Sequence, residues 1–190
     1  MKTRLRSNVD GFTLIEMLMV VAVAGILMAA AVMVMPGILG QGRADAGAAQ
    51  ALNALRVARD TAIEQRRNTE VVFIGNNRIE TVRDEILAGG APNGTTILSN
   101  VYLESAQFIQ FTGLGDTPDH FGSAGPIAFG STPHYMFTSE GTFIDATGDV
   151  LNGTVFLGTP GQTLSARAIT IFGPTALLHV WKWNGSSWID

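Results

Sequence analysis

The sequence contains no cysteine. Without cysteine the chain can form neither a disulfide framework nor a thiolate metal site, and it has no thiol nucleophile. Charged residues are also sparse, at 15% of the 190 residues, whereas hydrophobic residues make up 46%. This composition excludes a disordered chain. A chain of this length holds one ordinary domain together with a tail or an anchor.

Basic residues are nearly absent from the C-terminal half. From Gly94 onward only Arg167 and Lys182 are basic, and the whole chain has a formal net charge of −4. The acidic residues of the same half are Glu104, Asp116, Asp119, Glu140, Asp145, Asp149 and Asp190. Nucleic-acid binding needs a basic patch that neutralises phosphates. Nucleic acid is therefore not expected as a partner.

Signatures of catalysis and of ion binding are missing as well. No glycine-rich stretch is followed by the Gly-Lys-Ser/Thr of a phosphate loop, and no serine, histidine and acid match a triad signature. Asp116, Asp119 and His120 lie in the glycine-rich loop 113–125, but they lack the spaced acids of a calcium loop. We expect a solvated loop there, and the sequence leaves ion binding by it open. It predicts no enzyme, no cofactor and no metal site.

The N-terminal region carries a long apolar run. No polar side chain occurs from Met17 to Met35, and these 19 residues form a helix long enough to cross most of a bilayer core. A soluble helix would show a polar stripe, so this run belongs in lipid or in a wholly apolar bundle. A cleaved secretory signal is the alternative, but its apolar region spans only about 7–15 residues.

The charges on either side of the run predict its orientation. Lys2, Arg4 and Arg6 precede it, and Arg43 is the first basic residue after it. The positive-inside rule therefore places the N-terminus in the cytoplasm and the rest of the chain outside.

Glu16 is the one charge within the apolar segment 12–35. A carboxylate at the edge of a membrane helix is costly unless it snorkels to the headgroups or finds a partner. The residues around it, Gly-Phe-Thr-Leu-Ile-Glu-Met-Leu at 11–18, follow a basic leader and precede the apolar run. This combination resembles the prepilin processing motif of type IV pilins and type II secretion pseudopilins.

The resemblance implies three site residues. A prepilin peptidase would cut after Gly11, and Phe12 would become the N-methylated N-terminus. Glu16 would pair with the N-terminal amine of a neighbouring subunit, because two charges that are each costly in lipid become tolerable when paired. The implied partners are the peptidase, other pilins or pseudopilins, and inner-membrane lipid before assembly.

The rest of the chain reads as a helix followed by strands. Pro36, Gly37, Gly40 and Gly42 predict a bend or local melting around residues 36–42. An amphipathic helix is expected over 43–67, with an apolar face of Ala48, Leu52, Leu55, Ala62 and Ile63.

Short strands are expected after the helix, at 71–74, 78–82, 101–103, 107–111, 126–129, 135–138, 142–144, 154–157, 166–172 and 176–183. The absence of strand–helix alternation predicts an α+β, pilin-like fold: a long N-terminal helix, transmembrane and then amphipathic, packed on antiparallel sheets. At the C-terminus, an Asn-Gly turn at 184–185 would place Trp181 opposite Trp188. We expect Trp181 and Trp183 to pack on the sheet and Trp188 to be the better surface candidate.

The order of helix, paired strands and the closing strand 167–171 is similar to the GspH/FimT family of minor pseudopilins and minor pilins. The resemblance implies a cleaved leader (1–11), a transmembrane and filament-core helix (12–35), a helix continuation (36–68) and a β-rich periplasmic domain (69–190). It implies a minor pseudopilin of a type II secretion system, in the bacterial inner membrane and then in a filament. A type IV minor pilin, acting in pilus assembly or DNA uptake, is the alternative.

Overall fold

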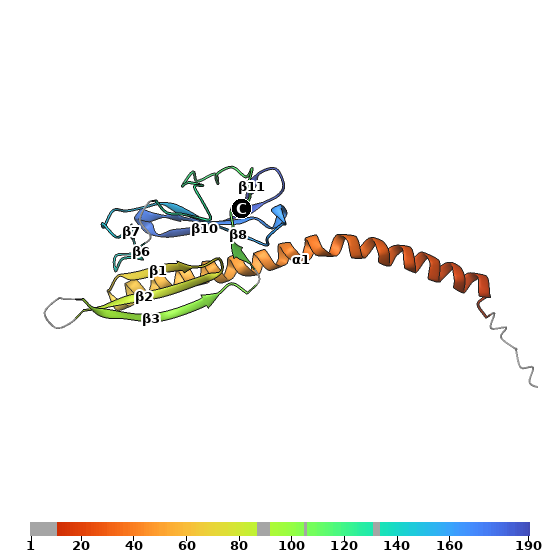
Figure 1. The fold of residues 1–190 in the computed structure, drawn as a ribbon, viewed down its shortest axis with the longest axis horizontal. Coiled ribbons are helices and arrows are strands. Elements are labelled where there is room, and N and C mark those ends of the chain that lie inside the picture. The colour runs from red at the N-terminus through yellow and green to blue at the C-terminus, as the bar shows by residue number, and fades with distance from the viewer. Residues whose placement is uncertain (1–10, 87–91, 105, 131–133) are drawn as a thin grey trace, which may run out of the picture. The chain divides into compact units, whose positions relative to one another are not determined.

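A computed structural model describes residues 11–86, 92–104, 106–130 and 134–190 (Figure 1). They fall into two units, one ending at Ile38 and the other comprising Leu39–Asp190. The helix α1 is Leu14–Gln65. The strands are β1 Thr69–Ile74, β2 Arg78–Ile86, β3 Pro92–Tyr102, β4 Gln107–Phe108, β5 Ile127–Ala128, β6 Tyr135–Phe137, β7 Phe143–Asp145, β8 Gly153–Gly158, β9 Arg167–Phe172, β10 Leu177–Trp183 and β11 Trp188–Ile189. Short 3-10 helices occupy Thr163–Ser165 and Gly173–Thr175.

The first unit contains the apolar part of α1. Leu14–Val32 is long and apolar enough to cross a membrane, and none of it is buried within the chain. Of the bend or local melting expected around residues 36–42, the melting is wrong, because the helix continues through these residues. A proline inside a helix removes one hydrogen bond, and the bonds of the turns on either side are enough to keep the chain helical here.

The second unit is built on two antiparallel sheets and the C-terminal part of α1. The first sheet has the order β3-β2-β1-β6-β7, and the second has the order β11-β10-β9-β8-β4, with β5 also paired to β8. The α+β class predicted from the sequence is confirmed: an N-terminal helix precedes antiparallel sheets (Figure 1).

One core joins the helix to both sheets. Leu55 of α1, Val71 and Ile79 of the first sheet, and Val155 and Ile169 of the second sheet all belong to it. The buried face of the helix is made mostly of small residues: Ala44, Ala48, Ala51, Ala54, Leu55, Ala58 and Ala62. Ile63, which was expected on this face, is 45% exposed. Small side chains let a helix lie close to a sheet, so the face of α1 that packs on the sheets consists mainly of alanines and not of its largest apolar residues.

Three predicted strands differ from the structure by more than two residues. The expected strand 78–82 continues to Ile86 in β2. The expected strand 101–103 is the end of the much longer β3, which pairs with β2 from Pro92 to Tyr102. The expected strand 107–111 is paired only at Gln107 and Phe108. The missed part of β3 is rich in asparagine, threonine and serine, and pairing with its neighbour fixes it as a strand despite its weak propensity.

The C-terminal hairpin has a different register from the one expected. Trp183, not Trp181, pairs with Trp188, and Lys182 pairs with Ile189. The connection is a loop of residues 184–187, in which Asn184 Oδ1 accepts hydrogen bonds from the backbone N–H groups of Ser186 and Ser187. A side chain that bonds the backbone ahead of it supports this wider loop in place of a two-residue turn.

Candidate processing and assembly site

The three predicted site residues lie together at the start of α1. Residues 11–13 have no regular structure, the helix begins at Leu14, and the side chain of Phe12 is exposed. A Cβ atom built on Gly11 would meet nothing within 4 Å. The local structure therefore does not demand glycine at this position.

Glu16 already has a partner within its own chain. Its carboxylate Oε2 accepts a hydrogen bond from the backbone N–H of Thr13 at 3.2 Å, and its own N–H donates to the Thr13 hydroxyl at 3.2 Å. The Thr13 hydroxyl also lies 3.3 Å from Glu16 Oε2. This is a capping box, in which threonine and glutamate three residues apart satisfy two free N–H groups of the first turn.

The capping box adds Thr13 to the candidate site. Sequence reasoning took Thr13 only as part of the motif, although a threonine three residues before a glutamate at the start of an apolar run is itself a helix-start signal. Its effect is to hold the carboxylate at the helix terminus, where the helix dipole also favours negative charge.

A second charged arrangement ties α1 to the second sheet. Arg167 of β9 is 1% exposed, and its Nε donates to Asp45 Oδ1 of α1 at 2.6 Å. Its Nη1 donates to the carbonyl oxygens of Ala166 and Leu164. Lys182 Nζ lies 3.9 Å from the other oxygen of Asp45. The two basic residues of the C-terminal half therefore both face α1.

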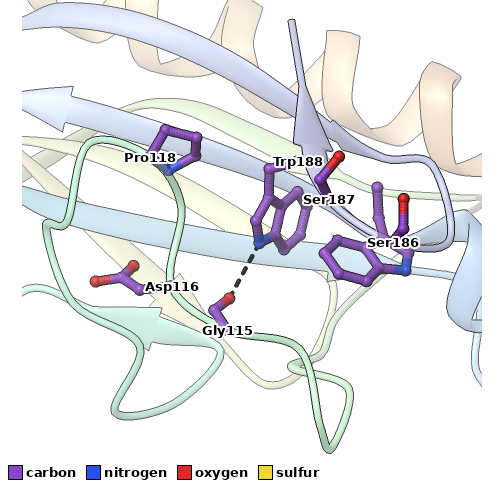
Figure 2. Close-up of a pocket in the computed structure, with 7 residues that line it drawn as sticks. Gly115, Asp116, Pro118, Ser186, Ser187 and Trp188 are labelled. Carbon is purple, nitrogen blue, oxygen red and sulfur yellow. Dashed lines mark hydrogen bonds between the residues drawn. The ribbon is translucent and has the colours of Figure 1, made fainter.

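The residues of loop 113–125, which was expected to be solvated, are nearly all exposed or half-exposed, and the loop is also anchored by hydrogen bonds. The indole N–H of Trp188 donates to the carbonyl of Gly115 at 3.0 Å (Figure 2). The indole N–H of Trp181 donates to Asp119 Oδ2 at 2.9 Å. Asp116 accepts bonds from the N–H groups of Thr117 and Gly122. Within the described ranges, no three histidine, cysteine or acidic residues gather in a way that could hold a metal ion.

The expected packing of Trp181 and Trp183 on the sheet is confirmed, because both pack against the cluster that contains Phe156 and Ala168. The prediction for Trp188 is wrong. Trp188 is only 8% exposed, whereas Trp181 and Trp183 are half-buried. The Trp188 ring packs on Phe156 and Trp183, with ring centroids 5.9 and 5.4 Å apart. Trp188 therefore closes a small second core on the outer face of the second sheet, and it is not the surface residue that was expected.

Comparison with known proteins identifies the N-terminal segment. Residues 6–32 match the family described as the prokaryotic N-terminal methylation motif. No curated protein sequence matches the chain.

Two solved structures are similar, both of the type IV minor pilin FimU of Pseudomonas aeruginosa in different crystal forms. They are 18% and 17% identical, with TM-scores of 0.44 and 0.45. They cover 79% and 83% of this chain and 97% of their own. The methylation motif coincides with the capped, apolar start of α1.

Proposed function

We propose that the chain is a structural subunit of a bacterial filament assembled from prepilin-type proteins, and specifically a minor pseudopilin of a type II secretion system. The observation that carries the filament role is the coincidence of the methylation motif at 6–32 with an exposed apolar helix that begins at Leu14. A span of this kind anchors the subunit in the inner membrane and later packs with other spans in the filament. The role is structural, not catalytic.

The proposal assigns each N-terminal residue a task. A prepilin peptidase cuts between Gly11 and Phe12, and Phe12 is then N-methylated. Glu16 pairs with the new amine of a neighbouring subunit and exchanges its contact with Thr13 for a charged partner. The basic residues Lys2, Arg4 and Arg6 keep the leader in the cytoplasm, so the body lies in the periplasm.

A type IV minor pilin is the second candidate, because the same motif serves both systems. The acidic C-terminal half argues against a pilin that captures DNA, because its two basic residues face Asp45 of α1. Deletion of the gene in its host separates the two candidates. We expect loss of the exported cargo from the medium with pili unaffected; loss of surface pili with normal secretion would assign the chain to the pilus instead.

The domain boundaries are part of the proposal. We expect residues 42–190 to form a soluble, monomeric α+β domain once the apolar span is deleted, because the core joins α1 to both sheets within this range. Circular dichroism and gel filtration of the truncated chain measure this directly. A disordered spectrum or elution as an aggregate would show that the boundary is wrong.

A further inference from the structure

The outer face of the second sheet carries a cleft beside the loop 113–125. The cleft has a volume of about 220 Å³ and is lined by Asp119, Phe121, Thr170, Phe172, Leu177 and His179. Leu178 and Val180, the residues between and after the lining residues of β10, belong to the core on the other face of the sheet. Strand alternation therefore directs the lining side chains of β10 away from α1 and into the cleft.

The carboxylate of Asp119 is held in a fixed position in this cleft. Its Oδ2 accepts hydrogen bonds from the Thr170 hydroxyl at 2.5 Å and from the Trp181 indole at 2.9 Å. No hydrogen bond is made to Oδ1 by the part of the chain that the structure describes. The Asp119 side chain is 28% exposed, so this oxygen can accept a donor from outside.

Among the residues that the structure describes, no lysine or arginine forms an ion pair with Asp119. The titratable neighbour on the sheet is His179, whose Nδ1 lies 3.8 Å from Asp119 Oδ2 and whose Nε2 lies 2.9 Å from Asp190 Oδ1. The two basic residues of this half, Arg167 and Lys182, both face Asp45 of α1. The cleft therefore presents a carboxylate that lacks a strong counter-ion.

The walls around this carboxylate are apolar and open to solvent. Phe172 is 40% exposed and Leu177 is 61% exposed, and these two residues face each other across the β9–β10 pair. Phe121 stacks on Phe172 with a centroid distance of 6.2 Å. Such walls suit the aliphatic stem of a long side chain whose charged end reaches the acid.

The neighbouring cavity on the same face does not combine a carboxylate that has a free oxygen with exposed apolar walls. It has a volume of about 340 Å³ and is lined by the loop residues Gly115, Asp116 and Pro118 and by the hairpin that carries Trp188. The Asp116 carboxylate points away from the Trp188 ring (Figure 2), and both of its oxygens accept backbone N–H groups of its own loop. That acid therefore stabilises the loop.

We propose that the cleft at Asp119 receives a lysine side chain of a protein partner. Because Oδ2 already accepts two hydrogen bonds, only Oδ1 is free to accept another. A single acceptor oxygen suits the ammonium group of lysine better than the guanidinium of arginine, which binds both oxygens of a carboxylate. The apolar walls would hold the lysine stem. The assignment goes beyond the filament role and does not depend on it, because it concerns the body and not the N-terminal motif.

The indole of Trp181 is a built-in reporter of this site, because it donates to Asp119, whereas the indole of Trp188 donates to Gly115. The full chain, labelled with ¹⁵N-tryptophan and held in detergent micelles, is titrated with Nα-acetyl-lysine methylamide. The titration is carried out at one constant pH. We expect a saturable shift of the Trp181 indole signal, weakened by added salt, with the Trp188 signal unchanged.

Matched variants identify the source of the shift. Asp119→Asn keeps an oxygen for Thr170 and Trp181 but removes the charge, and it should abolish the saturable shift. Asp60→Asn removes an exposed charge of α1, outside the cleft, and should leave the affinity unchanged. Leu177→Ser should weaken binding by about threefold or more, through loss of the apolar wall. An equal response to the uncharged norleucine analogue, tighter binding of the arginine analogue, or no response of Trp181 would overturn the proposal.

Discussion

Replacing Glu16 with valine is expected to abolish incorporation of the chain into filaments while leaving membrane insertion and cleavage after Gly11 intact. The substitution removes the one charge of the apolar segment, so insertion into lipid becomes easier. It also leaves the N-terminal amine of a neighbouring subunit without its partner in an apolar environment. Removing one member of such a buried pair typically costs about 3–5 kcal/mol. Copurification of the variant with the other filament subunits measures the loss.

Thr13→Val provides the matched control for Glu16→Val. It removes the hydroxyl of the capping box but keeps the carboxylate, and the loss of a helix cap costs about 1 kcal/mol. We therefore expect the Thr13 variant to assemble far better than the Glu16 variant. Equal assembly defects in both would show that Glu16 acts as a helix cap, and wild-type yield of Glu16→Val would remove its assembly role altogether.

Replacing Asp45 with alanine is expected to destabilise the body by about 3 kcal/mol, the low end of the range for breaking a buried ion pair, because Asp45 is itself half-exposed. The loss arises at Arg167, which is buried in β9 and would keep its charge without a counter-ion. Denaturant unfolding of residues 42–190 gives the change in free energy.

Two further variants separate this effect from a general sensitivity of the helix. Asp60→Ala removes an exposed acid from the same helix that pairs with Arg59 at the surface, and it should cost less than about 1 kcal/mol. Adding Arg167→Met to Asp45→Ala should recover much of the stability, because the uncompensated buried charge is gone. Asp45→Ala with the stability of the wild type would show that the ion pair contributes little.

The parts of the fold that could be predicted from sequence are those with local patterns. The apolar run at 17–35, the β1–β2 hairpin around residues 75–77 and the order of helix before strands all follow from composition and periodicity. Periodicity could not show that the alanine-rich face of α1 is the buried one, because alanine is equally common on exposed helix faces. Ile63 looked like a core residue and is half-exposed.

The contacts that complete the body join residues far apart in the chain. The Asp119 carboxylate accepts hydrogen bonds from Thr170 and Trp181. Arg167 of β9 forms an ion pair with Asp45 of α1. The anchoring of loop 113–125 could not be predicted, because its hydrogen-bond partners are distant in the sequence and the local pattern of glycines and acids does not indicate them. The Trp183–Trp188 pairing was missed because the bonding of Asn184 to the residues ahead of it decides the loop length.

The N-terminal mass of the mature chain shows whether it is processed as a prepilin. We expect the protein isolated from filaments of its host to begin at Phe12 and to carry one methyl group on the α-amine. Peptide mass spectrometry resolves both the cut after Gly11 and the methyl group in one measurement. A chain in assembled filaments that retains residues 1–11, or that begins at a different residue, would contradict the account.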